Sequence, residues 1–176
     1  MFKMKLSELK ELPEYFDRYI KKCDDVDIIQ AMQTSIDELN EIPLEEWKKI
    51  GNKTYEPGKW NIKDILQHLI DTERIFSYRA LVFARGDEQR VPSFPEDDYA
   101  TSAKAVERTL EDLINELKST HESAKTLFQS FPYEVLLRTG EGFKGPYSIA
   151  SIGFIMPVHQ RWHFEVIKEK YLSEDQ

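Results

Sequence analysis

Two histidines, His159 and His163, stand four residues apart near the C-terminus, and a third, His68, lies in a separate helix-like segment. Residues i and i+4 lie on one face of an α-helix, so both imidazoles can point at one ion. Imidazole is the commonest neutral metal ligand, and two from one helix plus one from a facing helix form a three-histidine site with an open position. Spacing alone leaves an alternative, which is a chance pair of surface or partly buried histidines.

A metal ion held by three neutral imidazoles keeps its full positive charge and at least one open position. Such an ion can lower the pKa of a bound water, which yields hydroxide for hydrolysis, or of a bound thiol, which yields a thiolate for transfer to an electrophile. Both reactions need the same ligands, so the sequence leaves both open. Three nitrogen ligands with open positions suit zinc, nickel, iron or manganese.

A carboxylate and two arginines accompany His68 on the same predicted helix. Asp71 follows His68 by three residues on a neighbouring part of the same face, which suits an outer partner of a metal-bound imidazole or a general base. The alternative is a helix-surface carboxylate paired with Arg74. Arg79 and Arg85 are candidates for binding an anionic substrate, or else for structural ion pairs.

Four other side chains have simpler interpretations. Glu73 is five residues from His68 and points away from it, so we expect it in a salt bridge. His121 lies in a polar stretch and is expected to be exposed. The indole of Trp60 is expected to anchor the start of its helix in the core. Cys23 has no cysteine–histidine pattern near it and is expected to be a packing residue.

Composition restricts the class of protein. At 176 residues, with 40% hydrophobic and 32% charged residues, the chain fits one globular domain, residues 1–176. A net charge of −8 argues against a nucleic-acid partner, which needs a basic surface. No apolar run approaches the roughly 18 residues of a membrane span, and the N-terminus lacks the apolar stretch of a signal peptide. A single cysteine suits the reducing cytoplasm, where we expect the protein.

Apolar residues recur at helical spacing through most of the chain, which predicts an all-α protein. One helix should begin with Asn61 as its N-cap and stop at Gly86. Its apolar residues cover much of its circumference, as expected of a helix in the middle of a bundle. We expect an N-terminal arm, a loop or small hairpin within residues 133–146, and four long helices at residues 25–42, 61–85, 101–130 and 148–171.

Loop lengths predict how these helices run. The loop from residue 86 to 100 spans roughly 45–50 Å when extended, longer than the about 37 Å of a 25-residue helix. It can therefore return along the bundle, so that the second and third helices run parallel. If the second and fourth helices are antiparallel, His68 lies roughly 10 Å from the start of its helix and His163 about 12 Å from the end of its own. These heights agree, so the three histidines can meet.

Several stretches resemble the DinB-like superfamily, and the resemblance extends over about residues 13–172. They read GKWNIKDI (58–65), HLIDTERIFSYRA (68–80) and FARGD (83–87), followed by the pair His159-x-x-x-His163. The resemblance implies a four-helix bundle in up-down-down-up order, commonly a homodimer, with a divalent metal held by His68, His159 and His163. The family includes metal-dependent hydrolases and transferases that use a low-molecular-weight thiol as cosubstrate.

The chain departs from the family pattern near its end. The family's final signature usually reads Gly-His-Glu-x-His-His, whereas this chain has Val158, Gln160 and Trp162 at the first, third and fifth places. Gln160 cannot take a proton, which excludes a general base at that position. We therefore expect a metal-dependent hydrolase or thiol-dependent transferase acting on a small molecule. The alternative is a bundle that binds a metal or a small molecule without catalysis.

Overall fold

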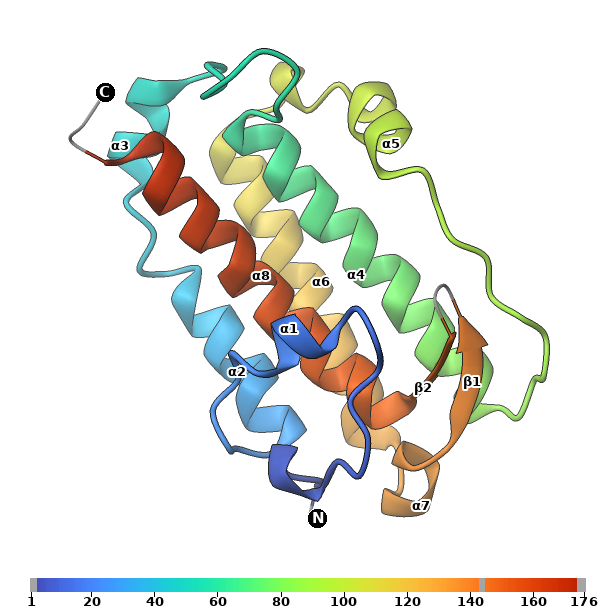
Figure 1. Cartoon of the computed structure of the whole chain (residues 1–176). Helices are drawn as coiled ribbons and strands as arrows, with labels where there is room; N and C mark the ends of the chain where they lie inside the picture. Colours follow the sequence, from blue (N-terminus) through green and yellow to red (C-terminus); the bar gives the residue numbers. More distant parts are fainter. Residues whose placement is uncertain (1–2, 143–144, 174–176) are drawn as a thin grey trace.

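Four long helices form the body of the molecule in the computed structural model, which describes residues 3–142 and 145–173 (Figure 1). They are α2 (Ile28–Glu38), α4 (Ile62–Ala84), α6 (Leu110–Ser130) and α8 (Ile149–Tyr171). Helices α2 and α4 each pack against both α6 and α8, which closes a four-helix bundle. No helix in the described part of the chain is both long and apolar enough to cross a membrane.

The helices follow the predicted up-down-down-up order. In Figure 1, α4 and α6 run in the same direction, whereas α2 and α8 run in the opposite one. The connector after α4 passes outside the bundle, back to the end where α4 begins, before the chain enters α5 (Glu96–Ala103). The connector therefore returns along the bundle, as its length predicted, and the parallel arrangement of α4 and α6 is confirmed.

The second bundle helix is bounded by the signals in its sequence. The Asn61 side chain accepts hydrogen bonds from the backbone N–H groups of Lys63 and Asp64, and the Asp64 carboxylate accepts one from the N–H of Asn61. This reciprocal cap satisfies N–H groups that have no partner within the helix. Gly86 follows the helix with a φ of 75°, a conformation that favours glycine. The predicted limits of α4 are confirmed.

A short hairpin leads into the last helix, as the glycine-rich tract predicted. Strand β1 (Thr139–Gly142) pairs antiparallel with β2 (Gly145–Ser148). The Ser148 hydroxyl then accepts from the N–H of Ser151 and caps α8, which runs continuously through Pro157. The two imidazoles thus lie near the middle of one unbroken helix.

Two predicted helices have different limits in the structure. The first was expected over residues 25–42, but Asp27 caps it and α2 ends at Glu38. The helix expected over residues 101–130 is divided, because Lys104 adopts a left-handed conformation after α5 and Thr109 caps a new helix, α6. The remaining short helices are η1 (Leu6–Glu8), α1 (Asp17–Ile20), α3 (Leu44–Ile50), η2 (Ala105–Glu107) and α7 (Tyr133–Leu136).

The N-terminal arm lies against the bundle, as expected, and its helix α1 packs on α8. The Lys3 ammonium donates to the carbonyls of Phe128, Gln129 and Phe131 at the end of α6. The negative end of the helix dipole favours a cation at this position. These bonds tie the start of the arm to the end of α6.

Two apolar clusters fill the interior, one toward each end of the bundle. On α8, residues 149–158 belong to one cluster and Ile167 to the other, with His159, Gln160 and His163 between them. Each bundle helix carries polar side chains at this boundary, which we call the polar layer. Its members are Ser35 and Glu38 on α2, Thr72 and Glu73 on α4, Thr120 and His121 on α6, and His159, Gln160 and His163 on α8.

Candidate metal centre

Three imidazoles from two helices converge at the edge of the polar layer. The Nε2 atom of His159 lies 3.4 Å from Nε2 of His68 on α4 and 3.1 Å from Nε2 of His163, one turn along α8. One ring nitrogen of each histidine lies within 4.8 Å of the others. No other group of three or more histidine, cysteine or acidic ligands comes together among the described residues. We call these residues the three-histidine cluster.

The spacing of these nitrogens fits a shared cation. Zinc–nitrogen bonds of about 2.0–2.1 Å in tetrahedral geometry place two ligand nitrogens about 3.3–3.4 Å apart. The two Nε2–Nε2 separations from His159, 3.4 and 3.1 Å, are close to this value. Three mutually facing nitrogens cannot all satisfy one another as hydrogen-bond donors and acceptors. A cation between them would satisfy all three lone pairs at once.

The imidazoles are neutral at physiological pH, which is the form that binds metals. Burial, reinforced by the charge of His163, lowers the pKa of His68 to about 3. Burial also lowers the pKa of His163 to about 4 and holds the pKa of His159 well below its usual value. No proton has to be displaced at pH 7 before a metal ion can bind.

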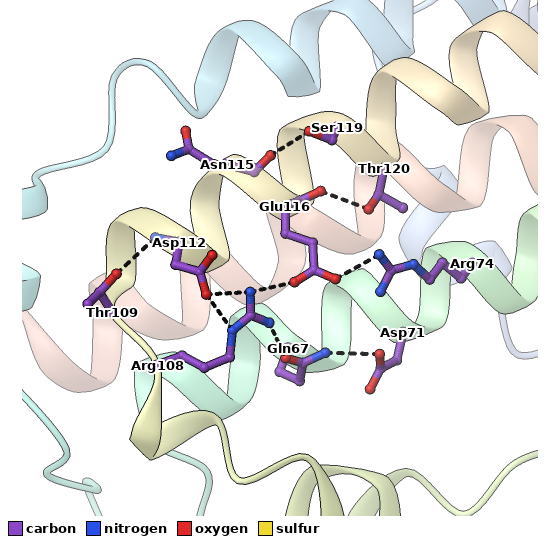
Figure 2. A network of polar contacts seen from close by, with 10 residues as sticks. All are labelled: Gln67, Asp71, Arg74, Arg108, Thr109, Asp112, Asn115, Glu116, Ser119 and Thr120. Carbon is purple, nitrogen blue, oxygen red and sulfur yellow. Dashed lines mark hydrogen bonds and ion pairs between the residues drawn. The ribbon is translucent and has the colours of Figure 1, made fainter.

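The other nitrogen of His68 is oriented by Thr72 rather than by Asp71. The Thr72 hydroxyl lies 3.4 Å from Nδ1 of His68, one helical turn away. Asp71 instead accepts a hydrogen bond from Gln67 at 3.0 Å, on the side of α4 that faces α6 (Figure 2). Among the described residues Asp71 forms no hydrogen bond with His68. Thr72 takes that place, because it follows His68 by four residues, about one helical turn.

Asp71 belongs to a network that joins α4 to α6 (Figure 2). Arg108 contacts the Gln67 amide at 2.8 Å and forms an ion pair with Glu116 at 2.5 Å, and Glu116 also pairs with Arg74 at 2.7 Å. Burial raises the pKa of Asp71, and the hydrogen bond from Gln67 opposes that shift. These contacts hold two helices together outside the cavity described next, so they indicate a structural role for Asp71.

A cavity of about 240 Å³ adjoins the three-histidine cluster. The Trp60 ring lies 4.7 Å from that of His68, centre to centre, and Tyr19 meets the His159 ring edge-on at 5.7 Å. The Tyr171 hydroxyl donates to the carbonyl of Trp60 and so fixes its position. The remaining lining side chains are Tyr15, Phe16, Thr72, Phe76, Arg79, Ser93, Phe94, Glu96, Ile155 and Trp162. An ion on the three imidazoles would therefore face a largely aromatic chamber.

His121 also lies in the polar layer, contrary to the prediction that it is exposed. His121 is only 3% exposed. Its Nδ1 pairs with the Glu73 carboxylate at 2.6 Å and its Nε2 lies 2.7 Å from Oε1 of Gln160. Burial alone would lower its pKa, but the charge of Glu73 and these hydrogen bonds outweigh burial and raise it. The salt bridge expected for Glu73 is confirmed, and we call these three residues the His121 cluster.

The His121 cluster explains what Gln160 does in place of the family's glutamate. The Gln160 amide accepts from His121 and donates to the carbonyl of Ser35 at 2.9 Å and to Glu38 at 3.2 Å. Every polar atom of this side chain is therefore used for contacts inside the bundle. Trp162, at the other altered position, lines the cavity and meets the Tyr19 ring at 5.4 Å.

The sequence missed most of the cavity wall. Tyr15, Phe16 and Tyr19 reach the histidines only because the arm folds back on α8, and Phe94 and Glu96 only because the connector returns along the bundle. Trp60 was expected in the core but lines the cavity. Cys23 is half-buried and its pKa is raised to about 11 by burial, which fits the predicted packing role.

Comparisons with known proteins agree with this architecture. Residues 28–167 match the family model described as the DinB superfamily. Among solved structures the chain is similar to YfiT from Bacillus subtilis, which is described as a probable metal-dependent hydrolase with an unusual four-helix bundle topology. The TM-score is 0.65 at 12% identity, over 92% of this chain and 89% of that one, so this likeness shows the fold alone. No curated protein matches the chain.

Proposed function

The chain belongs to the DinB superfamily, and from that premise we propose that it is a metal-dependent hydrolase of a small molecule, with a divalent ion held by His68, His159 and His163. One observation carries the proposal, namely that three neutral imidazoles from α4 and α8 converge beside a cavity. The description of YfiT as a probable metal-dependent hydrolase supports the same reaction class. Zinc, nickel, iron and manganese all suit three nitrogen ligands.

A bound divalent ion would supply the positive charge that lowers the pKa of a water or thiol at its open position. The chain's own residues orient the metal ligands and enclose the site. Thr72 sets the orientation of His68, while the aromatic side chains of the arm and of the connector exclude bulk water. In a cavity of this kind electrostatic interactions are stronger than in water.

A carboxylate in the cavity wall supports catalysis over simple binding. Glu96 lines the cavity at the start of α5, and burial, followed by the charge of Asp97, raises its pKa. A raised pKa makes a carboxylate a stronger base toward the proton of a bound water. Glu96 is thus the candidate general base in place of Asp71, which lies outside the cavity.

The first experiment is elemental analysis of protein purified without an affinity tag, beside His68→Ala and His163→Ala variants. We expect close to one divalent ion per chain in the parent protein and almost none in either variant. Asp71→Asn is the matched control, because Asp71 lies on the same helix outside the cavity, and it should keep its metal. Absence of metal after reconstitution with zinc, nickel, iron or manganese would overturn the proposal.

Metal-loaded protein should then be screened with nitrophenyl esters, amides and lactones, and with thiol plus an aryl halide. Hydrolysis that depends on His163 supports the proposed reaction. Turnover only with a thiol would assign the thiol-dependent transferase class, because the same open position accepts a thiol. No turnover in either screen at full metal occupancy would leave the non-catalytic binding bundle.

Two further expectations stay predictions, namely the homodimer that the family resemblance implies and the cytoplasmic location that the single cysteine suggests. Light scattering coupled to size-exclusion chromatography at micromolar concentration tests the first. A mass of twice 20.7 kDa would support the homodimer.

A further inference from the structure

Arg79 is a buried cation in the wall of the cavity that holds the three-histidine cluster. It is 3% exposed and lies on α4, eleven residues after His68. Eleven residues are about three turns, so both side chains leave the same face of the helix, roughly 16 Å apart along its axis. Helical side chains lean toward the N-terminus, which brings the long Arg79 side chain back toward His68. Arg79 and His68 both line the same cavity.

No described side chain neutralises the charge of Arg79. One Nη atom of Arg79 donates to the carbonyl of Pro92 at 2.7 Å, and the guanidinium lies 4.8 Å from the centre of the Phe76 ring. The Nε–H is buried without a hydrogen-bond partner. No acidic side chain among the described residues forms an ion pair with Arg79, in contrast to Arg74, Arg108 and Arg161.

A buried hydroxyl lies beside Arg79. The hydroxyl of Tyr147, on β2, interacts with the guanidinium, but this contact lacks the geometry of a full hydrogen bond. Its ring is only 3% exposed and stacks on Phe76 at 6.4 Å. Burying a charge without a counter-charge is costly, and buried polar groups without partners are rare. The exposed Arg85, which caps the C-terminus of α4, carries no such cost.

We propose that Arg79 binds the carboxylate of a small molecule whose apolar body lies along the aromatic cavity wall and whose opposite end reaches the three-histidine cluster. A carboxylate matches the planar guanidinium and supplies the missing counter-charge. The rings of Phe16, Phe76 and Trp60 supply an apolar surface between the two ends. The assignment of the reacting end rests on the proposed hydrolase function, whereas carboxylate binding at Arg79 does not require the metal.

The test uses metal-free protein and three aryl carboxylates of increasing length, phenylacetate, 3-phenylpropionate and 4-phenylbutyrate, each beside its neutral amide. Trp60 and Trp162 line the cavity, so tryptophan fluorescence reports binding, and calorimetry gives the affinity. We expect at least one acid to bind ten times more tightly than its amide. Arg79→Gln should remove that preference while binding the amide as the parent protein does. Arg85→Gln, the matched control on the same helix, should keep the preference.

Equal binding of every acid and amide, or an unchanged preference in Arg79→Gln, would overturn the inference. If Arg79→Gln does not fold, Arg79→Lys carries the test, because it keeps the charge and loses the planar fork, and its acid preference should fall at least threefold. Metal content is measured separately. If the protein takes up no metal but still binds acids through Arg79, the hydrolase proposal fails and the carboxylate site stands. If the protein takes up a full complement of metal but shows no preference for acids, the carboxylate site fails and the hydrolase proposal stands.

Discussion

The four histidines lie in two clusters, one with a single imidazole and one with three, whose surroundings are opposite. In the His121 cluster both ring nitrogens face oxygen acceptors, at 2.6 and 2.7 Å, and the pKa of the imidazole is raised. In the three-histidine cluster the Nε2 atoms face one another, and every pKa is lowered. Both groups are packed between the same two apolar clusters, so burial alone does not distinguish them.

The difference lies in what each group still requires. The His121 cluster is complete, because the charge of Glu73 and the amide of Gln160 satisfy the imidazolium within the protein. The three-histidine cluster is incomplete, because its lone pairs point at one another and at a cavity. A buried histidine with its own acceptors is a structural residue, whereas buried histidines without them indicate a ligand.

Glu73→Gln should give the largest effect. Removing one charge of a buried pair leaves the other without compensation and costs about 3–5 kcal/mol. We expect that loss in the free energy of unfolding from urea denaturation, together with an unchanged ratio of metal to protein in the folded fraction. A loss below about 1 kcal/mol would contradict the assignment of the His121 cluster as a structural ion pair.

Metal removal should give the next largest effect, and on the other cluster. A ligand present at about a thousand times its Kd stabilises the folded state by about 4 kcal/mol. Chelation should therefore lower the melting temperature of the parent protein by several degrees, and added metal should restore it. His163→Ala, which lacks one ligand, should respond to neither treatment. If this variant responds as the parent protein does, the stabilising metal is bound somewhere other than the three-histidine cluster.

Thr72→Val and Asp71→Asn compare two neighbouring side chains. Thr72 lies against Nδ1 of His68, so its loss should weaken metal binding about tenfold, the lower end of the range for partners of metal-bound histidines. Asp71→Asn should leave metal affinity unchanged and cost less than about 1 kcal/mol of stability. Metal affinity measured by competition with a chromogenic chelator checks both variants. A larger loss of metal affinity in Asp71→Asn than in Thr72→Val would instead identify Asp71 as the partner of His68.

Acid should destabilise the metal-free protein by the smallest amount. The folded pKa values of His68 and His163, about 3 and 4, lie below the unfolded value near 6.5, so the unfolded chain binds more protons in between. Stability through each histidine of this cluster therefore falls by about 0.7 kcal/mol between pH 7 and 6. His121, with its raised pKa, contributes in the opposite sense, and its contribution is lost as pH rises through the folded value.

The losses from His68 and His163 add up to about 1.4 kcal/mol from pH 7 to pH 6. His159 adds to this loss and His121 opposes it, and we expect the parent protein to be less stable at pH 6. Urea unfolding of the chelated protein at both pH values measures the loss, with His163→Ala as the comparison. That variant should lose about 0.7 kcal/mol less than the parent protein over the same interval. Equal stability of the parent protein at both values would show that the three histidines are not held in a neutral state.

Much of the fold was predictable because its signals are local. The cap at Asn61, the glycine after α4 and the hairpin glycines act within a few residues, and the loop length set the parallel pair of helices. The divided helix at Lys104 was missed because residues 101–108 contain no proline or glycine. The exposure of His121 was wrongly predicted because its acidic partner lies on another helix, 48 positions earlier in the chain.

The sequence by itself determined the bundle and which imidazoles share a face, because helical periodicity fixes the direction of each side chain relative to its own axis. Only the tertiary structure decided the partner of each polar side chain. It placed Thr72 rather than Asp71 on His68, enclosed His121 between Glu73 and Gln160, and left Arg79 without a counter-charge at the cavity. Those contacts depend on how helices turn toward one another and on where the arm and connector lie. Both follow from packing across the whole chain.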